Sequence, residues 1–247
     1  MSFYGPVRGV LVPQANTTVE PEMRVLLGGT LLSARLRSRS EDSRTRGLEY
    51  LERIEEVLLD FDTAPLAAAG FAYTASSYFI GPAREDETFD RLSATHGHPV
   101  LSAARSVRAA LAALGARRIG LVSPYPAWLH EAAGRYWREA GFEPKHSASL
   151  APDMGDTRAI YALDPVSAET LADIAAEVDA IVISGTGLPS LPTIVAADHL
   201  GVPVLSSNLC LAWTMSGGAP ASLRELLAPA AAWRTRLAAA LKDAADA

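Results

Sequence analysis

The sequence predicts an α/β protein built from two similar halves. The first observation is Asp179–Leu191 (DAIVISGTGLPSL), in which a short apolar, β-branched run leads into a turn of small residues. Such a run is typical of a strand buried on both faces of a parallel sheet. The second observation is that Ala69–Tyr78 (AGFAYTASSY) has the same order of parts, an apolar strand followed by small and hydroxyl-bearing residues.

Two further matches flank this repeat in the same order. Gly9–Val12 (GVLV) precedes the first copy as Gly120–Ser123 (GLVS) precedes the second. Pro99–Ser102 (PVLS) follows the first copy as Pro203–Ser206 (PVLS) follows the second. The three matches lie at offsets of 111, 110 and 104 residues, and their common order indicates a duplicated unit.

We predict a boundary between the halves at Gly115–Arg118. The resulting units are an N-terminal lobe at 1–115 and a C-terminal lobe at 116–216. Residues 217–247 then form a C-terminal helix that is rich in alanine and leucine. Its apolar surface is expected to pack on the lobes or on a dimer partner. A homodimer or higher homo-oligomer is expected.

Composition limits the classes of function. The chain has 247 residues, 49% of them apolar, so it can bury a sizeable core. A net charge of −6 argues against a general nucleic-acid or anionic-membrane surface. Cys210 is the single cysteine, which excludes an internal disulfide and a cysteine-based zinc site. No apolar run approaches membrane-spanning length and no signal-peptide core is apparent, so a cytoplasmic protein is expected.

Periodicity places the remaining elements. Further strands are predicted at Val7–Val12, Leu31–Arg39, Val100–Leu101, Ile119–Val122, Phe142–Ser149 and Val202–Leu205. Helices are predicted at Arg44–Phe61, Ser102–Leu114, Ala127–Ala140, Asp164–Ala176, Ser190–His199 and Leu223–Leu241. Gly81–Thr88 and Ala151–Thr157 are predicted to be polar loops, and His96 and His98 to lie in a surface loop without further metal-ligand spacing.

Polar side chains at the carboxyl ends of strands are the candidates for a ligand cleft, because ligands of open α/β sheets bind there. Ser184–Gly187 offers hydroxyls and backbone N–H groups at the start of a helix, where anions bind. Asn16 either caps the following helix or enters the cleft. Tyr125 either presents its phenol to the cleft or belongs to the core.

The motifs VPQANTTVEPEM (Val12–Met23), AYTASSYFIG, SPYP, SGTGLPSL and PVLSSN resemble, in this order, those of the Asp/Glu racemase superfamily. The resemblance is closest to the branch of maleate cis-trans isomerases and arylmalonate decarboxylases, and it extends from Val7 to Trp213. It implies two pseudo-symmetric Rossmann-like lobes, each with a parallel sheet flanked by helices. One cofactor-independent site is implied between the lobes, with no metal.

The resemblance also implies which residues are altered. Family members use two cysteines, one per lobe, or one in the decarboxylases; Ala75 and Gly185 align with these two positions. Neither residue can attack a double bond or carry a proton, which argues against thiolate chemistry of the family type. The positions implied to hold the carboxylates of a small diacid carry Asn16, Ser76, Ser77, Tyr125, Thr186 and Gly187, with Ser206 and Asn208 as supports and Thr157 in place of a family asparagine.

The sequence leaves the acid or base open. Tyr125, His130, Asp153, Cys210 and a bound water are the candidates; Cys210 is either activated by a helix start or inert in a core. The favoured hypothesis is an isomerase, racemase or lyase acting on a small carboxylate. The alternatives are a non-catalytic carboxylate-binding protein and a hydrolase or hydratase that uses a non-thiol base in the same cleft.

Overall fold

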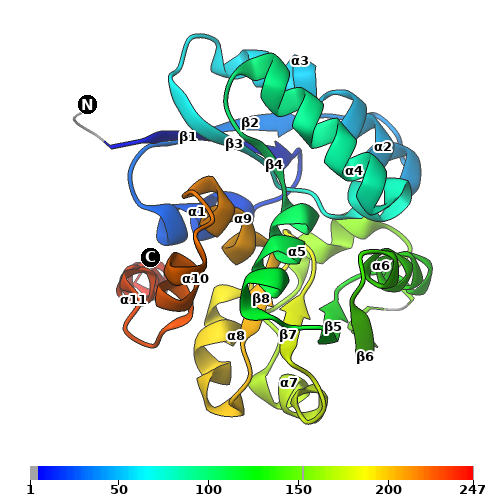
Figure 1. Cartoon of the computed structure of the whole chain (residues 1–247), viewed down its shortest axis with the longest axis vertical. Coiled ribbons are helices and arrows are strands. Elements are labelled where there is room, and N and C mark those ends of the chain that lie inside the picture. Colours follow the sequence, from blue (N-terminus) through cyan, green and yellow to red (C-terminus); the bar gives the residue numbers. More distant parts are fainter. Residues whose placement is uncertain (1–4, 152, 247) are drawn as a thin grey trace.

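The structure is a computed structural model that describes residues 5–151 and 153–246. It contains two four-stranded parallel sheets with equivalent strand orders, β2-β1-β3-β4 and β6-β5-β7-β8 (Figure 1). The strands are β1 (Val7–Pro13), β2 (Leu31–Leu36), β3 (Leu66–Phe71), β4 (Val100–Ser102), β5 (Arg118–Ser123), β6 (Glu143–Ser149), β7 (Ala180–Ile183) and β8 (Val204–Ser206). The predicted α/β fold of two similar parallel-sheet halves is confirmed.

Helices cover both sheets, and α1, α5 and α9 lie between them (Figure 1). The helices are α1 (Val19–Leu27), α2 (Ser43–Glu52), α3 (Ile54–Leu58), α4 (Ala75–His96), α5 (Ala103–Leu114), α6 (Ala127–Glu139), α7 (Ala168–Ala175), α8 (Leu191–Ala196), α9 (Ser207–Met215), α10 (Pro220–Leu227) and α11 (Ala232–Ala245). Shorter 3₁₀ helices are η1 (Leu59–Phe61), η2 (Thr157–Ala162) and η3 (Ala197–Leu200). Among the described residues, no helix has both the length and the apolar character needed to cross a bilayer.

Strand β1 shows how the core is divided. Val10 and Val12 face a large cluster that includes residues of both sheets, such as Leu121 and Leu205. Leu11 points to the opposite face and joins a smaller cluster beneath α2, α3 and α4. Successive strand side chains alternate between the faces of a sheet. Because both faces of the N-terminal sheet are covered, the buried part of β1, Gly9–Pro13, carries no polar side chain on either face.

The strand registers define the internal symmetry. Phe71 on β3 pairs with Leu11 and Ser102, and Ile183 on β7 pairs with Val122 and Ser206. Phe71 and Ile183 are therefore equivalent. The sequence pattern aligns Ala75 with Gly185, whereas the strand registers align Tyr73 with Gly185. A slip of two residues preserves the alternation of apolar and polar positions, so the pattern alone does not reveal it.

Several predicted elements have different bounds. Helix α4 extends to His96, which was predicted to lie in a surface loop, and three predictions differ more. Gly81–Thr88 is not a loop: it lies within α4, where Gly81 has φ 79° and breaks the helix before Pro82 starts it again. The predicted helix Arg44–Phe61 is divided into α2, α3 and η1. The predicted helix Leu223–Leu241 is two helices, because Pro229 holds the preceding residue, Ala228, in an extended conformation at ψ 147°.

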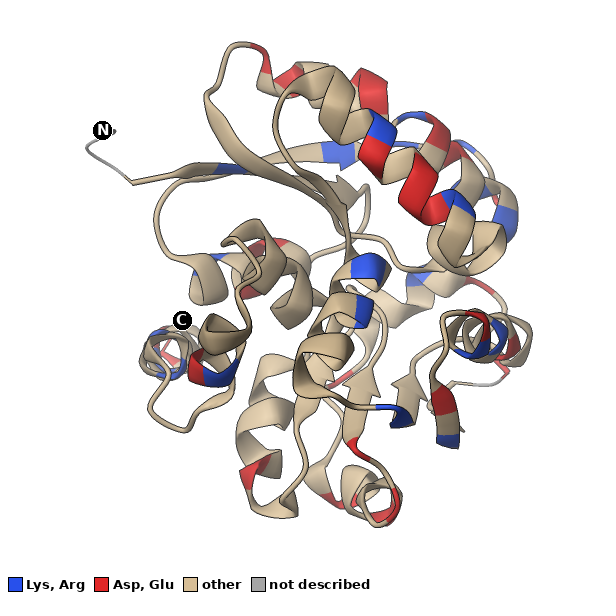
Figure 2. Cartoon of the chain, in the orientation of Figure 1, with Lys and Arg blue, Asp and Glu red and all other residues tan. Residues whose placement is uncertain are grey.

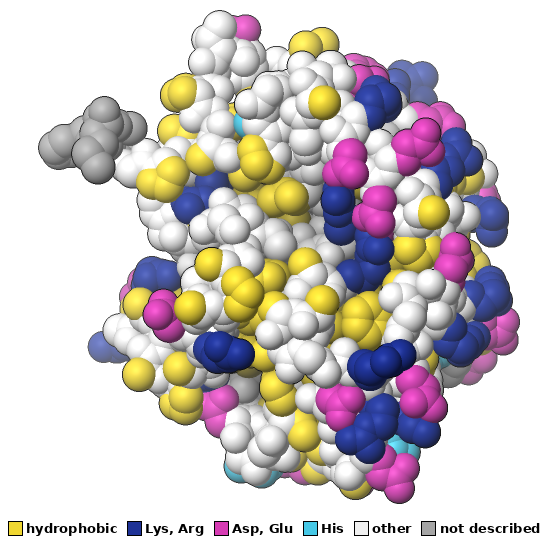
Figure 3. Space-filling view, in the orientation of Figure 1, with side chains coloured by type: hydrophobic (Ala, Val, Ile, Leu, Met, Phe, Trp, Pro, Cys, Tyr) yellow, Lys and Arg dark blue, Asp and Glu magenta, His cyan; other side chains and the backbone are white. Residues whose placement is uncertain are grey.

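Charged residues of both signs are interspersed on outer helices such as α2, α4 and α6 (Figure 2). On the face shown in Figure 3, basic and acidic side chains gather side by side over α4 and α5. Arg105 bonds to Asp90 at 2.7 Å, and Arg108 bonds to the buried Glu85 at 3.2 Å.

Candidate active site

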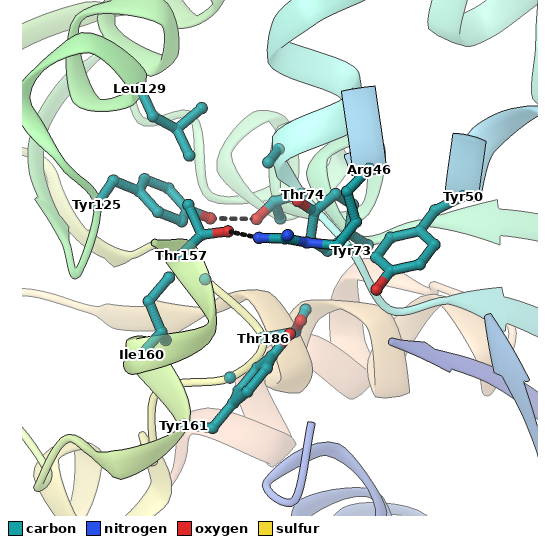
Figure 4. Close-up of a pocket in the computed structure, with 13 residues that line it drawn as sticks. Arg46, Tyr50, Tyr73, Thr74, Tyr125, Leu129, Thr157, Ile160, Tyr161 and Thr186 are labelled. Atoms are coloured by element: carbon teal, nitrogen blue, oxygen red, sulfur yellow. Dashed lines mark hydrogen bonds between the residues drawn. The ribbon is translucent and has the colours of Figure 1, made fainter. Parts of the chain in front are cut away.

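A small pocket lies between the lobes, beside the turns that follow β3 and β7 (Figure 4). The space among its lining residues is about 400 Å³, a volume that includes open solvent. The lining residues are Arg46, Tyr50, Tyr73, Thr74, Ala75, Tyr125, Leu129, Thr157, Ile160, Tyr161, Gly185, Thr186 and Gly187. Among the described residues that line the pocket, none is Asp, Glu, His or Cys.

Arg46 supplies the positive charge of the pocket. It projects from α2, is 2% exposed and reaches across to the second lobe. Its Nη2 donates to Asp156 Oδ1 at 2.7 Å and to Thr157 Oγ1 at 3.0 Å, while its Nη1 donates to two backbone carbonyls at 3.1 Å. A buried guanidinium needs such partners, since an unpaired charge in the interior is costly.

Four tyrosines line the rest of the pocket, and burial raises the pKa of Tyr50, Tyr73, Tyr125 and Tyr161. Their phenols are therefore neutral at physiological pH. Tyr125 and Thr74 share a hydrogen bond that joins the two lobes (Figure 4). Neutral hydroxyls can donate hydrogen bonds to an anion, but they are poor bases.

The pocket has two chemically different ends. Arg46 and Tyr50 lie at one end, and Leu129 and Ile160 lie at the other, with Thr157 between them (Figure 4). A ligand that fills it would meet a cation at one end and an apolar surface at the other.

The glycine turn after β7 is packed closely against other lining residues. Gly185 has φ 110°, and a Cβ atom there would lie 3.3 Å from the Tyr125 hydroxyl. At Gly187 a Cβ atom would lie 2.6 Å from the ring of Tyr161. The N–H of Gly185 donates to Ser207 Oγ at 3.1 Å. This N–H is therefore already used within the protein, contrary to the expectation that the whole turn is free to receive a carboxylate.

The structure brings together six of the predicted site residues. Tyr125, Ala75, Thr157, Gly185, Thr186 and Gly187 line one pocket. Thr157 also donates to Ser43 Oγ at 3.2 Å, and Thr186 Oγ1 donates to the Ala72 carbonyl at 2.7 Å.

The four other predicted binding residues are not among the lining residues of this pocket, and each is already hydrogen-bonded within the protein. Asn16 Oδ1 accepts from the N–H of Thr18 at 2.9 Å, at the start of α1, and Asn16 Nδ2 donates to the lining residue Thr186 at Oγ1, at 3.4 Å. Ser76 Oγ donates to the Gly47 carbonyl at 2.6 Å, and Ser77 Oγ donates to Glu85 at 2.6 Å. Asn208 Nδ2 donates to Glu22 at 2.8 Å and to the Thr186 carbonyl at 3.0 Å. Asn208 therefore contacts the glycine turn without reaching the pocket.

His130, Asp153 and Cys210 also lie outside the pocket lining. The ring nitrogens of His130 pair with Ser123 and Ser147, both at 2.6 Å, and burial lowers its pKa. Cys210 is fully buried in α9, and desolvation raises the pKa of its thiol. Asp153 is exposed.

Seven lining residues were not predicted from the sequence: Arg46, Tyr50, Tyr73, Thr74, Leu129, Ile160 and Tyr161. Tyr73 could have been found from the correct register, since it is the internal counterpart of Gly185: each is the second residue after the equivalent Phe71 and Ile183. If the two family cysteines obey this symmetry, the position paired with Gly185 is Tyr73 and not Ala75. Arg46 gave no signal, because arginine within an amphipathic helix is usually solvated.

The fold and the site define a two-lobed α/β protein with a polar pocket, bearing one cation, between two parallel sheets. The family model described as arylmalonate decarboxylase matches residues 8–225, so the chain belongs to that family. The predicted resemblance is thereby confirmed.

The chain is similar to several maleate isomerases. The chain is 32% identical to the maleate isomerase of Nocardia farcinica over 237 residues, covering 90% of this chain and 91% of the relative. The crystal structure of the maleate isomerase Iso from Pseudomonas putida S16 superposes with a TM-score of 0.78 at 25% identity, covering 86% of this chain and 92% of that one. A cysteine-to-serine mutant of the Nocardia farcinica maleate cis-trans isomerase, with a covalently bound succinylcysteine intermediate, superposes with a TM-score of 0.74 at 26% identity, covering 86% and 92%.

Proposed function

We propose that this protein is a cofactor-independent enzyme of the isomerase or lyase type that acts on a small carboxylate bound in the pocket between its lobes. The observation that carries the proposal is the composition of the lining: one buried guanidinium and several neutral hydroxyls, with no carboxylate among the described lining residues. Such a set favours an anion, because guanidinium and carboxylate match in charge and geometry. The names of the similar proteins support the same class of substrate.

The lining also favours one reaction within this class. The succinylcysteine of the Nocardia farcinica mutant implies a thiol that adds to the substrate, and the only thiol of this chain is buried outside the pocket lining. Decarboxylation of a malonate-type acid needs no thiol and no base. The carbon–carbon bond breaks, carbon dioxide leaves, and the electron pair remains as an enediolate. Hydroxyl donors stabilise that charge, and a proton from a hydroxyl or water completes the product.

The two ends of the pocket suit this reaction. The carboxylate that is retained would bind Arg46, with Tyr125, Thr74 and the other hydroxyl donors beside it, where charge develops. The apolar end at Leu129 and Ile160 would favour loss of charge from a carboxylate placed there. Isomerisation by addition would instead require a nucleophilic thiol, and racemisation would require a base; the described lining residues supply neither.

A non-catalytic carboxylate-binding protein is the second candidate. It is favoured by His130, whose two ring nitrogens are both bonded to serines, and by the buried position of Cys210. This candidate predicts ligand-dependent stabilisation of the fold without turnover.

Proton NMR in deuterated water separates these candidates. The purified protein is incubated with a substituted malonate, maleate, malate, aspartate and a small amide, each with a no-protein control. Decarboxylation gives a monoacid with deuterium at the α-carbon. Conversion of maleate, hydration or hydrolysis would contradict decarboxylation and name the alternative reaction. Binding of an acid without any conversion would contradict catalysis. If no acid binds and none is converted, the proposed carboxylate site is wrong.

We also propose a homo-oligomer in the cytoplasm. A groove between α1, α8 and α11 is lined by apolar residues including Leu237 and Leu241, and Leu241 is 51% exposed. An exposed apolar groove of this kind is common at subunit contacts. Light scattering coupled to size-exclusion chromatography tests the oligomer, and a monomer across the micromolar range would contradict it.

A further inference from the structure

We propose that Asp156 forms the ion pair with Arg46 when no ligand is bound, and that a substrate carboxylate must displace Asp156 from Arg46. This inference rests on the proposed function and deepens it. It defines one end of the pocket as a subsite for the charged group of a dicarboxylate.

The first argument is the bonding of Arg46. Its Nη2 meets three acceptors, Asp156 Oδ1 at 2.7 Å, Thr157 Oγ1 at 3.0 Å and Ser43 Oγ at 3.1 Å. Nitrogen Nη2 carries only two hydrogens, so these three acceptors compete. An incoming carboxylate would therefore compete for a donor, Nη2, whose two hydrogens are already shared among three acceptors.

The second argument is the position of Asp156. It precedes η2, which contributes Thr157, Ile160 and Tyr161 to the pocket lining. The Asp156 side chain is 36% exposed, whereas that of Arg46 is 2% exposed. The carboxylate can therefore move toward water, while the guanidinium stays in the pocket.

The third argument is that Asp156 keeps a partner when it leaves Arg46. Arg158 donates to it from the backbone N–H at 2.9 Å and from Nε at 2.8 Å. These bonds lie within one short segment and move with it. The exchange therefore leaves neither carboxylate unpaired, which lowers its cost.

The fourth argument is space. The pocket as it stands is largely filled by its own lining side chains, and it would have to widen to hold a diacid. The segment 156–162 covers the glycine turn, with the Tyr161 ring against Gly187. Its polar bonds to the first lobe are those of Asp156 and Thr157 with Arg46 and Ser43. Release of Asp156 would loosen the segment and widen the pocket.

The test compares dissociation constants for phenylmalonate and maleate in the full-length wild type, Asp156→Asn, Arg46→Gln and the double variant. Asparagine keeps the shape of Asp156 and its capping of η2 but removes the competing charge. We expect Asp156→Asn to bind about tenfold more tightly, a factor equivalent to about 1.4 kcal/mol. Arg46→Gln should bind the acids at least about tenfold more weakly than the wild type. The double variant should differ from Arg46→Gln by less than about twofold in its dissociation constants, because Asp156 then has no guanidinium to compete for.

Asp153→Asn is the matched control, because it removes the same charge from an exposed residue three positions away. Equal tightening by both variants would mean a general charge effect and would overturn the proposal. Weaker or unchanged binding by Asp156→Asn, with wild-type binding intact, would also overturn it.

Hydrogen exchange measured without any acid separates this inference from the proposed function. Asp156→Asn and Arg46→Gln should speed amide exchange in 156–162, whereas Asp153→Asn should not. If no form binds either acid, the proposed carboxylate site and the displacement both fail. Unchanged amide exchange in Asp156→Asn would show that Asp156 does not hold the segment 156–162 in place, and it would overturn that part of the proposal independently of the binding results.

Discussion

Asn208 Nδ2 donates a hydrogen bond of 2.8 Å to the buried carboxylate of Glu22, which joins α9 to α1 beside the glycine turn. Glu22 also accepts from the N–H groups of Ser190 and Leu191 at the start of α8, at 2.5 and 3.0 Å. A carboxylate of the first lobe therefore stabilises the start of a helix in the second lobe. This arrangement holds the turn that lines the pocket.

Glu22 should give stability a specific pH dependence. Burial raises its pKa above the ordinary value of 4.5, and this effect exceeds the opposing effect of its hydrogen bonds. The folded state then holds the proton more tightly than the unfolded state. The free energy of unfolding attributable to Glu22 should therefore fall as pH rises from about 4.5 through the raised pKa.

Urea unfolding of the wild type and Glu22→Gln at several pH values tests this. The variant should lack this decline. It should also be less stable by about 1–3 kcal/mol at low pH, because the glutamine NH2 group would face groups that themselves donate, such as Asn208 Nδ2. A stability difference that stays constant with pH would contradict the raised pKa.

Tyr125 should matter for turnover, whereas Tyr78 should not. Both phenols are buried and bonded to a hydroxyl, Tyr125 to Thr74 and Tyr78 to Ser184, but only Tyr125 is among the lining residues of the pocket. We expect Tyr125→Phe to lower kcat by about 10²-fold, the typical effect of removing one donor to a developing oxyanion. Steady-state kinetics on the substrate identified by NMR measures this, with Tyr78→Phe as the control. Equal losses in both variants would indicate a structural effect.

Cys210 should be inert. The thiol is fully buried in α9, and burial raises its pKa, so it is neither accessible nor ionised at neutral pH. We expect no reaction with a thiol reagent in the native protein, full reaction in guanidinium, and unchanged turnover in Cys210→Ala. Rapid native labelling together with loss of turnover would restore Cys210 as a catalytic candidate.

Gly187 should tolerate no side chain. A Cβ atom there would lie 2.6 Å from the Tyr161 ring and 3.2 Å from Ile160, so the segment 156–162 would have to move. We expect Gly187→Ala to destabilise the protein by about 1–3 kcal/mol. Gly155→Ala is the matched control, because no atom lies within 4 Å of its Cβ position. Thermal unfolding of the two variants distinguishes them, and similar melting temperatures would show that the segment yields freely.

The sequence by itself determined the duplicated α/β fold. Apolar β-branched runs such as Ala180–Ile183 can be satisfied only by burial on both faces of a sheet, and their repetition in order specified two such sheets. The turns after these strands, with Thr186 and Gly187, were found in the same way, because the carboxyl ends of parallel strands adjoin one another.

Only the tertiary structure decided which side chains share the pocket. Ser76, Ser77 and Arg46 are all polar residues on helices, and local pattern cannot separate a side chain that bonds within its own lobe from one that crosses to the other. Arg46 is a lining residue because Asp156 and Thr157, more than a hundred positions later, meet its guanidinium. Partners so distant in the chain are fixed by how the lobes pack, and no periodicity records that packing.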